Sequence, residues 1–312
     1  MRALIVTNMY PSPEHPALGS FVRDQVRALQ RIPEIDVELF SFDPGSPVAY
    51  MNAARELRRR HRGVRFDVVH AHFGLTAWPA LAAPSHHHAV TLHGMDLIHP
   101  RSRAITLAGL RFVDLVAVVS KSFVKRVPGW ATRTPVAVLP CGVDVERFKP
   151  IPRAQARAAL GLDPDGPYLL FPHDPARTVK RFELAREVAG EVPLLTLGSI
   201  DPEQVPLWVN AVNAVLIPSD WESFGLGVLE ALACNVPVLA TPTGIAPQVL
   251  QGVAGAYCGA FELDAWRAAL APHLAAPEPR IDGRERAEAY SSDRLAADVV
   301  AAWRALISAR DS

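Results

Sequence analysis

Two glutamates, Glu222 and Glu230, stand on either side of a stretch whose pattern is typical of a phosphate-binding site. The apolar run over residues 214–217 predicts a buried strand, and a polar loop separates it from a helix that opens between residues 224 and 227. The start of such a helix offers unpaired backbone N–H groups and the positive end of the helix dipole. Carboxylates on both sides suit the hydroxyl groups of a ligand with a sugar at each end of a diphosphate. The stretch therefore predicts a nucleotide-sugar site.

Two basic residues, Arg177 and Lys180, are the predicted phosphate partners. They follow a predicted strand over residues 168–171, in a half of the chain that is otherwise acidic. A guanidinium and an ammonium beside a diphosphate would neutralise the charge of the leaving group as the sugar departs. The alternative is a basic helix start on the surface. We favour the site because the pair follows a strand.

The histidines allow more than one interpretation. His93 lies between a predicted strand and Gly94, where it either has a structural role or binds a sugar hydroxyl. Asp96 either orients His93 or turns the chain. A metal site at His70 and His72, which share one face of a strand, is an alternative that we disfavour because no ordered carboxylate accompanies them. The further histidines 86–88 are predicted to lie in a polar turn.

The composition indicates which classes of protein to consider. Lysine plus arginine and aspartate plus glutamate each number 32, but residues 1–150 hold 19 basic and 12 acidic residues, so the first half favours an anionic partner. Three separated cysteines predict reduced thiols. No apolar run approaches the roughly 20 residues of a membrane helix, and no secretory signal is visible. We expect a soluble, cytoplasmic protein.

Strands and helices alternate along the chain, which predicts an α/β fold with parallel, doubly wound sheets. Strands are expected over residues 3–7, 37–42, 68–71, 89–92, 115–119, 136–139, 168–171, 194–197, 214–217 and 238–240. Helices are expected after Ser20 as N-cap, over 52–62, 75–83 and 101–111, after Ser120, over 153–160 and 180–189, at the opening stretch, near 246, and over 262–275 and 292–307. We place the domains at residues 1–150 and 151–312, with a helical tail that packs back on the first domain.

Ligands of such sheets bind beyond the carboxyl ends of the strands, so the loops after the strands are the candidate site. These loops cover residues 8–19, 93–96, 120–121, 173–180, 198–199, 219–225 and 241–244. If the two domains face each other, the loops line one cleft. The dinucleotide fingerprint, the Walker loop, the Gly-x-Ser-x-Gly elbow and nucleic-acid motifs are all absent, so we expect no nucleic-acid partner.

Five arginines are packed into one predicted helix; they are Arg55, Arg58, Arg59, Arg60 and Arg62. The first interpretation is a solvated helix face. The functional alternative is a surface that meets an anionic membrane or an acidic acceptor.

With these residues in view, the chain resembles the retaining GT-B glycosyltransferases of family 4 over nearly its full length. The motifs that carry the resemblance are, in order, Asn8-Met-Tyr-Pro-Ser-Pro, Gly19-Ser-Phe-Val with Gln25, Asp67-Val-Val-His-Ala-His72, His93-Gly-x-Asp96, Val118-Val-Ser120, Leu139-Pro-Cys-Gly-Val-Asp-x-Glu-x-Phe148 and Glu222-x-Phe-Gly-x-x-x-Leu-Glu230-Ala-x-Ala. The last is similar to the family's Glu-x7-Glu signature. The chain departs from many members in the short Arg177–Lys180 spacing and in Arg181, which stands where they have a glycine.

The resemblance implies two Rossmann-like domains, no required metal or cofactor, and transfer with retention. It implies that Glu230 binds the ribose and that Glu222 and His93 contact the donor sugar. Arg177 and Lys180 would then stabilise the diphosphate. The remaining donor-binding residues that we predict are Ser223, Phe224, Gly225, Leu226, Gly19, Gly198 and Ser219.

The predicted function is a metal-independent glycosyltransferase that uses a UDP- or GDP-type nucleotide-diphospho-sugar in cell-surface polysaccharide or glycolipid synthesis. The basic first half supports the hypothesis of a lipid-linked or anionic acceptor, with peripheral contact at the inner face of the cell membrane. The alternatives are a catalytically degenerate nucleotide-sugar or glycan binding protein and another GT-B enzyme such as a sugar-nucleotide epimerase.

Overall fold

The computed structural model describes residues 1–13, 15–198 and 200–309, and it divides into two units. The first unit comprises Met1–Gly142 together with the residues from Ser292 onward, and the second unit comprises Val143–Ser291. The division falls earlier than the predicted boundary at residue 150. The reason is local: the backbone N–H of Val143 donates to the carbonyl of Tyr290 at 2.9 Å, so the chain after Gly142 already pairs with the second unit.

The first unit is built on a six-stranded parallel sheet in the order β2-β1-β3-β4-β5-β6. Its strands are β1 (Arg2–Thr7), β2 (Asp36–Ser41), β3 (Phe66–His72), β4 (Ser85–Leu92), β5 (Leu115–Val118) and β6 (Ala137–Val138). Its helices are α1 (Ser20–Gln30), α2 (Pro47–Arg60), α3 (Ala77–Ala80), α4 (Met95–Ile98), α5 (Pro100–Gly109), α6 (Lys121–Val124) and α14 (Ser292–Ser308), with short 3-10 turns η1 (Gly74–Thr76), η2 (Leu110–Phe112) and η3 (Gly129–Ala131). The predicted doubly wound topology is confirmed for this unit.

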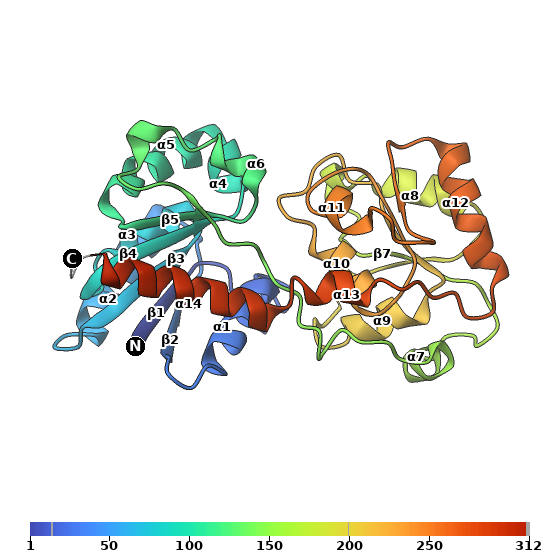
Figure 1. Ribbon diagram of the computed structural model, residues 1–312, viewed down its shortest axis with the longest axis horizontal. Helices are drawn as coiled ribbons and strands as arrows, with labels where there is room; N and C mark the ends of the chain where they lie inside the picture. The colour runs from blue at the N-terminus through green and yellow to red at the C-terminus, as the bar shows by residue number, and fades with distance from the viewer. Residues whose placement is uncertain (14, 199, 310–312) are drawn as a thin grey trace. The chain divides into compact units, whose positions relative to one another are not determined.

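The last helix, α14, completes the core of the first unit, and Figure 1 shows it lying along the sheet near α1. Ala296, Val299, Val300 and Trp303 belong to the same buried cluster as apolar side chains of β1 and α1. The Trp303 indole is fully buried, and its N–H donates to Nδ1 of His70 on β3 at 2.9 Å. Helix α14 is therefore a structural part of the first unit.

The second unit contains a five-stranded parallel sheet in the order β11-β10-β9-β7-β8. Its strands are β7 (Leu169–Phe171), β8 (Leu194–Thr196), β9 (Ala214–Ile217), β10 (Val238–Ala240) and β11 (Tyr257–Cys258). Its helices are α7 (Arg153–Leu160), α8 (Phe182–Ala189), α9 (Val205–Ala211), α10 (Leu226–Ala233), α11 (Ala246–Leu250), α12 (Leu263–Ala275) and α13 (Arg284–Glu288), with one 3-10 turn η4 (Thr178–Lys180). Three of these elements, α9, β11 and α13, were not predicted from the sequence.

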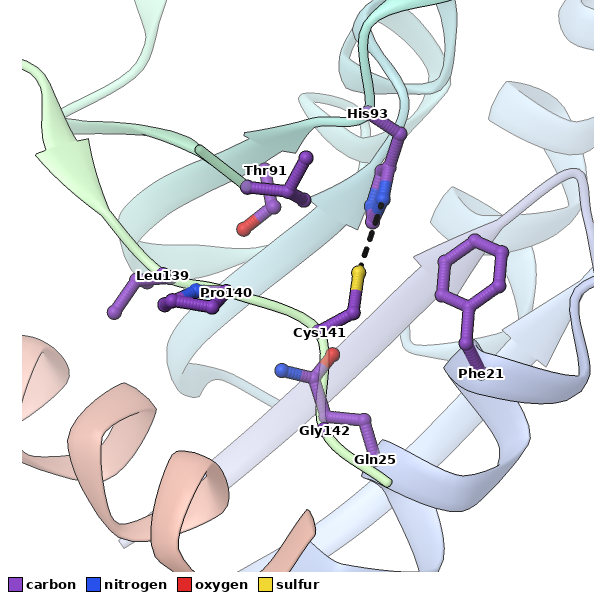
Figure 2. A pocket seen from close by; sticks show the side chains of 9 residues that line it. Phe21, Gln25, Thr91, His93, Leu139, Pro140, Cys141 and Gly142 are labelled. Atoms are coloured by element: carbon purple, nitrogen blue, oxygen red, sulfur yellow. Dashed lines mark hydrogen bonds between the residues drawn. The ribbon is translucent and has the colours of Figure 1, made fainter. Parts of the chain in front are cut away.

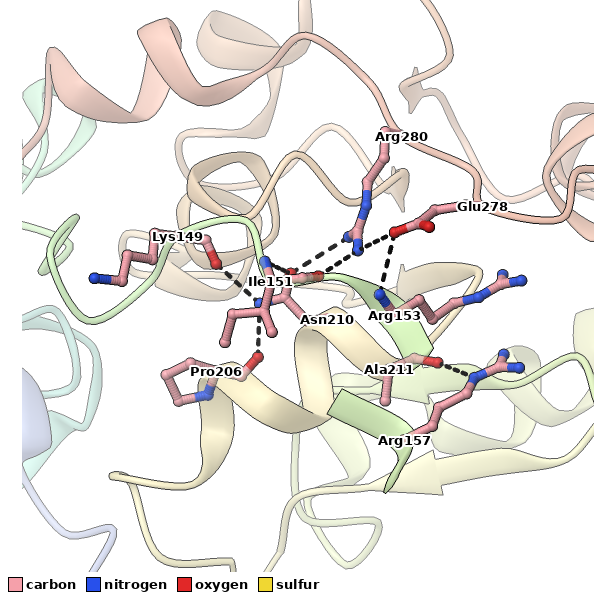
Figure 3. Close-up of polar contacts among 9 residues, drawn as sticks. All are labelled: Lys149, Ile151, Arg153, Arg157, Pro206, Asn210, Ala211, Glu278 and Arg280. Carbon is pink, nitrogen blue, oxygen red and sulfur yellow. Dashed lines mark hydrogen bonds and ion pairs between the residues drawn. The ribbon is translucent and has the colours of Figure 1, made fainter. Parts of the chain in front are cut away.

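A polar network fixes the segment before α7 onto the second unit, as Figure 3 shows. The side chain of Asn210 accepts the N–H of Ile151 at 2.9 Å and donates to the carbonyl of Lys149 at 3.0 Å. Arg280 donates to the carbonyl of Ile151 at 2.7 Å. The segment that the sequence suggested as a domain boundary is therefore anchored within one unit.

Candidate functional site

A buried cluster around Glu222 lies beyond the carboxyl ends of β7 and β9. Lys180 Nζ is 2.5 Å from Glu222 Oε2, and the two side chains are only 5% and 8% exposed. Ser219 Oγ donates to Glu222 Oε1 at 2.8 Å, and His173 Nε2 is 3.5 Å from the same oxygen. Ser219 and Glu222 follow β9, whereas His173 and Lys180 follow β7. The parallel sheet thus brings two loops together around one carboxylate, as the position of both loops predicts.

The charges of this cluster are strongly coupled. Burial alone would raise the pKa of Glu222, but its contacts with His173 and Lys180 outweigh burial and lower the pKa to about 2. Burial lowers the pKa of Lys180 below its usual value, and Glu222 opposes that shift. Burial also lowers the pKa of His173 below its usual value. At neutral pH the cluster therefore contains an ionised carboxylate, an ammonium and a neutral imidazole.

The two predicted phosphate partners differ in exposure. Lys180 ends the 3-10 turn η4 and points into the cluster, whereas Arg177 lies at the start of that turn and is exposed. Arg181 adopts a left-handed conformation, with φ 56°, so α8 begins at Phe182 instead of at Lys180. The side chain of Arg181 pairs with Asp220 at 2.7 Å. A non-glycine residue here adopts a conformation that glycine favours, which explains how the chain does without the glycine that many family members have there.

Two glycines allow the loops at the start of α10 to approach closely. Gly225 has φ 97° and directly precedes Leu226, the first residue of the helix. Gly244, from the loop after β10, has φ 58°, and a Cβ atom there would lie 2.3 Å from the carbonyl oxygen of Phe224. Phe224 is buried and Ser223 is half-buried. The helix start is therefore shaped by backbone, with few side chains in the way.

The other predicted donor-binding residues of the second unit lie on α10 and in the loop after β8. Glu230 is half-buried and lies about one turn into α10. Gly198 is exposed after β8, and a Cβ atom there would lie 3.4 Å from Cα of Asp174 in the loop after β7. Ser199 lies outside the described residues. The roles assigned to Glu230 and Gly198 stay predictions.

In the first unit, His93 belongs to a chain of buried polar side chains. His93 Nε2 is 3.0 Å from Nδ1 of His72, and His93 Nδ1 is 4.0 Å from Sγ of Cys141. Figure 2 shows the pocket that His93 and Cys141 line together with Phe21. Burial lowers the pKa of His93 well below its usual value, that of His72 to about 4, and raises that of Cys141 to about 12. His93 is therefore a neutral group held in place.

His70 and histidines 86–88 lie in strands of the first sheet. His70 stacks on His72 with ring centroids 5.3 Å apart, and its Nε2 is 2.8 Å from Oγ1 of Thr91. Because Trp303 donates to Nδ1 of His70, the neutral ring carries its proton on Nε2 and donates to Thr91. Histidines 86–88 lie inside β4, so the predicted polar turn is wrong: strand pairing with β3 starts at Ser85. No group of three or more His, Cys, Asp or Glu side chains among the described residues is arranged to hold a metal ion.

Asp96 and Gly19 shape the loops of the first unit. Asp96 accepts hydrogen bonds from the backbone N–H groups of His93 and Gly94 at 3.0 and 2.8 Å, so it turns the chain. Among the described hydrogen bonds, none joins Asp96 to the His93 ring. Gly19 has φ 65° and is itself the N-cap residue of α1, so the predicted cap at Ser20 is wrong. A Cβ atom at Gly19 would lie 2.2 Å from the carbonyl oxygen of Met9. The glycine therefore permits the close approach of the first loop.

Sequence reasoning missed His173, His72 and Cys141 as members of these clusters. His173 was included in a candidate loop but was not singled out, because the sequence does not show which residue a lone histidine after a strand will contact. Its position two residues after β7 was the signal that could have identified it. The contacts of His72 and Cys141 with His93 depend on the sheet register, which cannot be predicted from the spacing of these residues in the sequence.

Comparison with known proteins agrees with this fold. The family Glycosyltransferase Family 4 matches residues 4–147, and the family Glycosyl transferases group 1 matches residues 176–289. A D-inositol 3-phosphate glycosyltransferase of Pseudarthrobacter chlorophenolicus is 26% identical, in an alignment that covers 95% of this chain and 83% of that relative.

Solved structures with the same architecture include two that span almost the whole chain. A sucrose-phosphate synthase from Thermosynechococcus elongatus has a TM-score of 0.76 at 20% identity, covering 99% of this chain and 100% of that one. The Anabaena protein HepE, solved in complex with UDP and glucose, has a TM-score of 0.70 at 14% identity, covering 97% and 99%. At these identities the structures support the fold alone.

The two parallel-sheet units and the family matches define the chain as a glycosyltransferase with the GT-B fold. Within that class it belongs to glycosyltransferase family 4. No helix in the described part of the chain has the length and apolar character that a membrane span requires.

Proposed function

We propose that this glycosyltransferase moves a sugar from a nucleotide-diphospho-sugar of the UDP or GDP type to an acceptor hydroxyl, with retention at the anomeric carbon and without a required metal. The observation that supports the proposal best is the buried Lys180–Glu222 pair beside the start of α10. The likeness to HepE, which was solved with UDP and glucose, is compatible with such a donor.

Lys180 and the start of α10 suit the diphosphate of the donor. The ammonium of Lys180 is held by Glu222, so its position is set before a ligand arrives. Arg177, exposed in the same loop, adds a second positive charge on the same side. Backbone N–H groups at Phe224 to Leu226 would donate to phosphate or sugar oxygens. Together these groups would stabilise the negative charge that builds on the diphosphate as the glycosidic bond breaks.

Glu222 suits the binding of sugar hydroxyls better than proton donation. Its pKa of about 2 keeps the carboxylate ionised at neutral pH, so it accepts hydrogen bonds and is a poor general acid. His93 is neutral and would contact the sugar through a ring nitrogen, and Glu230 would accept hydrogen bonds from the ribose hydroxyls. We assign no covalent nucleophile. In the proposed same-face substitution, the acceptor oxygen bonds to the anomeric carbon while the leaving phosphate oxygen takes the acceptor's proton.

The direct test is incubation of the purified protein with several nucleotide-sugars, with and without a chelator. We expect donor turnover that the chelator leaves unchanged, and a product whose anomeric configuration matches that of the donor. Strict dependence on a divalent ion would refute metal independence, and an inverted product would refute retention. Tight donor binding without turnover would identify a binding protein instead, and an epimerised nucleotide-sugar would identify an epimerase.

A matched pair of variants tests the assignment of Glu230. Glu230→Ala should weaken nucleoside diphosphate binding by about tenfold or more, because charge-assisted hydrogen bonds are worth about 1.5–3 kcal/mol. Glu285→Ala, an exposed acid on the neighbouring helix α13, should leave binding unchanged. Calorimetry that gives equal affinities for the two variants would remove the role of Glu230.

The acceptor stays a hypothesis. The basic residues of the first half support an anionic or lipid-linked acceptor, and a panel of phosphorylated polyols and lipid-linked sugars would test that class.

A further inference from the structure

The first unit carries a group of large apolar side chains that are exposed to solvent. Ile105 is 50% exposed, Phe112 56%, Trp130 63% and Trp78 39%. We call these four residues the aromatic patch. Monomeric proteins rarely leave large aromatic side chains together on the surface unless the surface binds something.

Contacts link Trp78 to Ile105 and Phe112, and a hydrogen bond from Arg111 holds the Trp130 backbone near the same turn. The Trp78 indole N–H donates to the carbonyl of Ile105 at 3.1 Å, and the Trp78 and Phe112 rings have centroids 5.9 Å apart. Arg111 donates to the carbonyl of Trp130 at 2.7 Å, which brings Trp130 next to the turn that holds Phe112. The four side chains come from α3, α5, η2 and η3, and Figure 1 shows α4, α5 and α6 together on one side of the six-stranded sheet.

The segment that carries Ile105, Phe112 and Trp130 is strongly basic. Residues 95–133 contain seven lysines and arginines and two aspartates. Both aspartates are engaged within the fold: Asp96 is buried against backbone N–H groups, and Asp114 accepts the N–H of His88 at 2.9 Å. The basic residues are Arg101, Arg103, Arg111, Lys121, Lys125, Arg126 and Arg133, and all but Arg103 are exposed. In the described part of the chain, none of them forms an ion pair with a carboxylate.

We propose that the aromatic patch and its basic surroundings bind the surface of an anionic lipid bilayer. Tryptophan and phenylalanine insert at the boundary between headgroups and acyl chains, while lysine and arginine are attracted to anionic headgroups. A lipid surface fits both features at once, because it offers an apolar layer beneath a layer of negative charge. An acidic protein partner would fit the charge but would leave four apolar side chains to be matched by another apolar surface.

The arginine-rich helix α2 is the rival surface that the sequence suggested. Its exposed apolar residues are Val48 and Met51, and Met51 lies one turn from the exposed Arg55, whereas Arg59 pairs with Glu56 at 3.4 Å. No exposed aromatic ring accompanies those arginines: the one aromatic residue of α2, Tyr50, is half-buried. Large exposed aromatic side chains therefore accompany basic residues at the aromatic patch and not on α2. This inference goes beyond the proposed function, because attachment to a bilayer is measured without donor or acceptor.

The experiment is sedimentation of the full chain with vesicles of phosphatidylcholine alone or of phosphatidylcholine with phosphatidylglycerol. We expect binding only to the anionic vesicles, and weaker binding as salt is raised. Phe112→Ser/Trp130→Ser should reduce the affinity about tenfold or more, because each large apolar side chain loses its burial in the interface. The substitutions Lys125→Gln and Arg126→Gln should each reduce the affinity for anionic vesicles by about fivefold. The matched control Arg58→Gln/Arg59→Gln/Arg60→Gln on α2 should bind as the wild type does.

Two results would overturn the proposal. The first is a wild-type chain that fails to bind anionic vesicles at low salt, or that binds neutral vesicles equally well. The second is loss of binding in the α2 control while the patch variant still binds. A conservative variant guards against misfolding: brominated lipid should quench the total tryptophan fluorescence of the wild type more than that of Trp130→Phe. Equal quenching in the two proteins would count against insertion of Trp130.

Discussion

Replacing Lys180 by methionine should destabilise the second unit, because it leaves the buried carboxylate of Glu222 without its cation. Methionine preserves the length and apolar stem of the lysine side chain, so the change removes charge and hydrogen bonding with little loss of packing. Lys180 and Glu222 are 5% and 8% exposed, so water cannot easily replace the lost partner. Removing one member of a buried ion pair typically costs about 3–5 kcal/mol.

The magnitude can be worked from the pKa of Glu222. The contacts with His173 and Lys180 outweigh burial and lower this pKa from 4.5 to about 2, which corresponds to about 3 kcal/mol of stability at neutral pH. Because the folded-state pKa is the lower one, that stability is complete above pH 4.5 and is lost as the pH falls toward 2. Burial also lowers the pKa of Lys180, which opposes part of the gain, and Ser219 keeps its hydrogen bond in the variant. We therefore expect a loss of about 2 to 3 kcal/mol at pH 7.

The assay is a double-mutant cycle with Lys180→Met, Glu222→Gln and the combined variant. Because two units need not unfold together, native-state hydrogen exchange of β7 and β9 should replace a single denaturation curve. The double variant should be more stable than the sum of the two single losses predicts, with a coupling energy of about 2 kcal/mol at pH 7. The stability advantage of the wild type over Glu222→Gln should shrink as the pH is lowered from about 4.5 toward 2. A coupling energy below about 0.5 kcal/mol at pH 7 would refute the buried pair.

Two further predictions concern the loops and the last helix. Gly244→Ala should destabilise the protein by about 2 kcal/mol or more, because φ is 58° and the new Cβ would meet the Phe224 carbonyl. The control Gly252→Ala should cost only about 1 kcal/mol, because φ is 77° but the space around the new Cβ is open. Equal shifts of the two variants in thermal unfolding would contradict this prediction. Trp303→Phe should lower the free energy of unfolding by about 1–3 kcal/mol, because Nδ1 of the buried His70 loses its hydrogen-bond donor. Unchanged nitrogen chemical shifts of the His70 ring in this variant would show that the hydrogen bond does not form in solution.

Helices and strands could be predicted where the spacing of apolar residues and the length of the segment both indicated the same type of element. Strand β9, strand β10 and helix α7 have the bounds that the pattern predicts, because each is a short apolar or amphipathic run with clear turn residues around it. Helix α9 was missed because its sequence is short, contains Pro206 and shows no helical period. The two-residue strand β11 is defined by pairing with β10 and has no pattern of its own.

The site was predictable as a set of loops but not as a set of contacts. Position after a strand was enough to select Glu222, Lys180 and Ser219 as candidates. Nothing in residue type reveals that Lys180 is buried while Arg177 is exposed, because the two residues lie at opposite ends of the 3-10 turn η4, which has no pattern of its own in the sequence. Pairing between loops is set by the order and register of strands, which single-sequence patterns do not encode.

The return of α14 to the first unit has a consequence for how the protein is made. The second unit is one continuous segment, whereas the core of the first unit lacks Trp303 and its neighbours on α14 until the whole second unit has been synthesised. At about 5–20 residues per second, the ribosome needs about 7 to 30 s to make the intervening segment Val143–Ser291. During that time the nascent sheet has an uncovered apolar face, to which a chaperone could bind. The first unit can therefore complete its core only after the second unit has been synthesised.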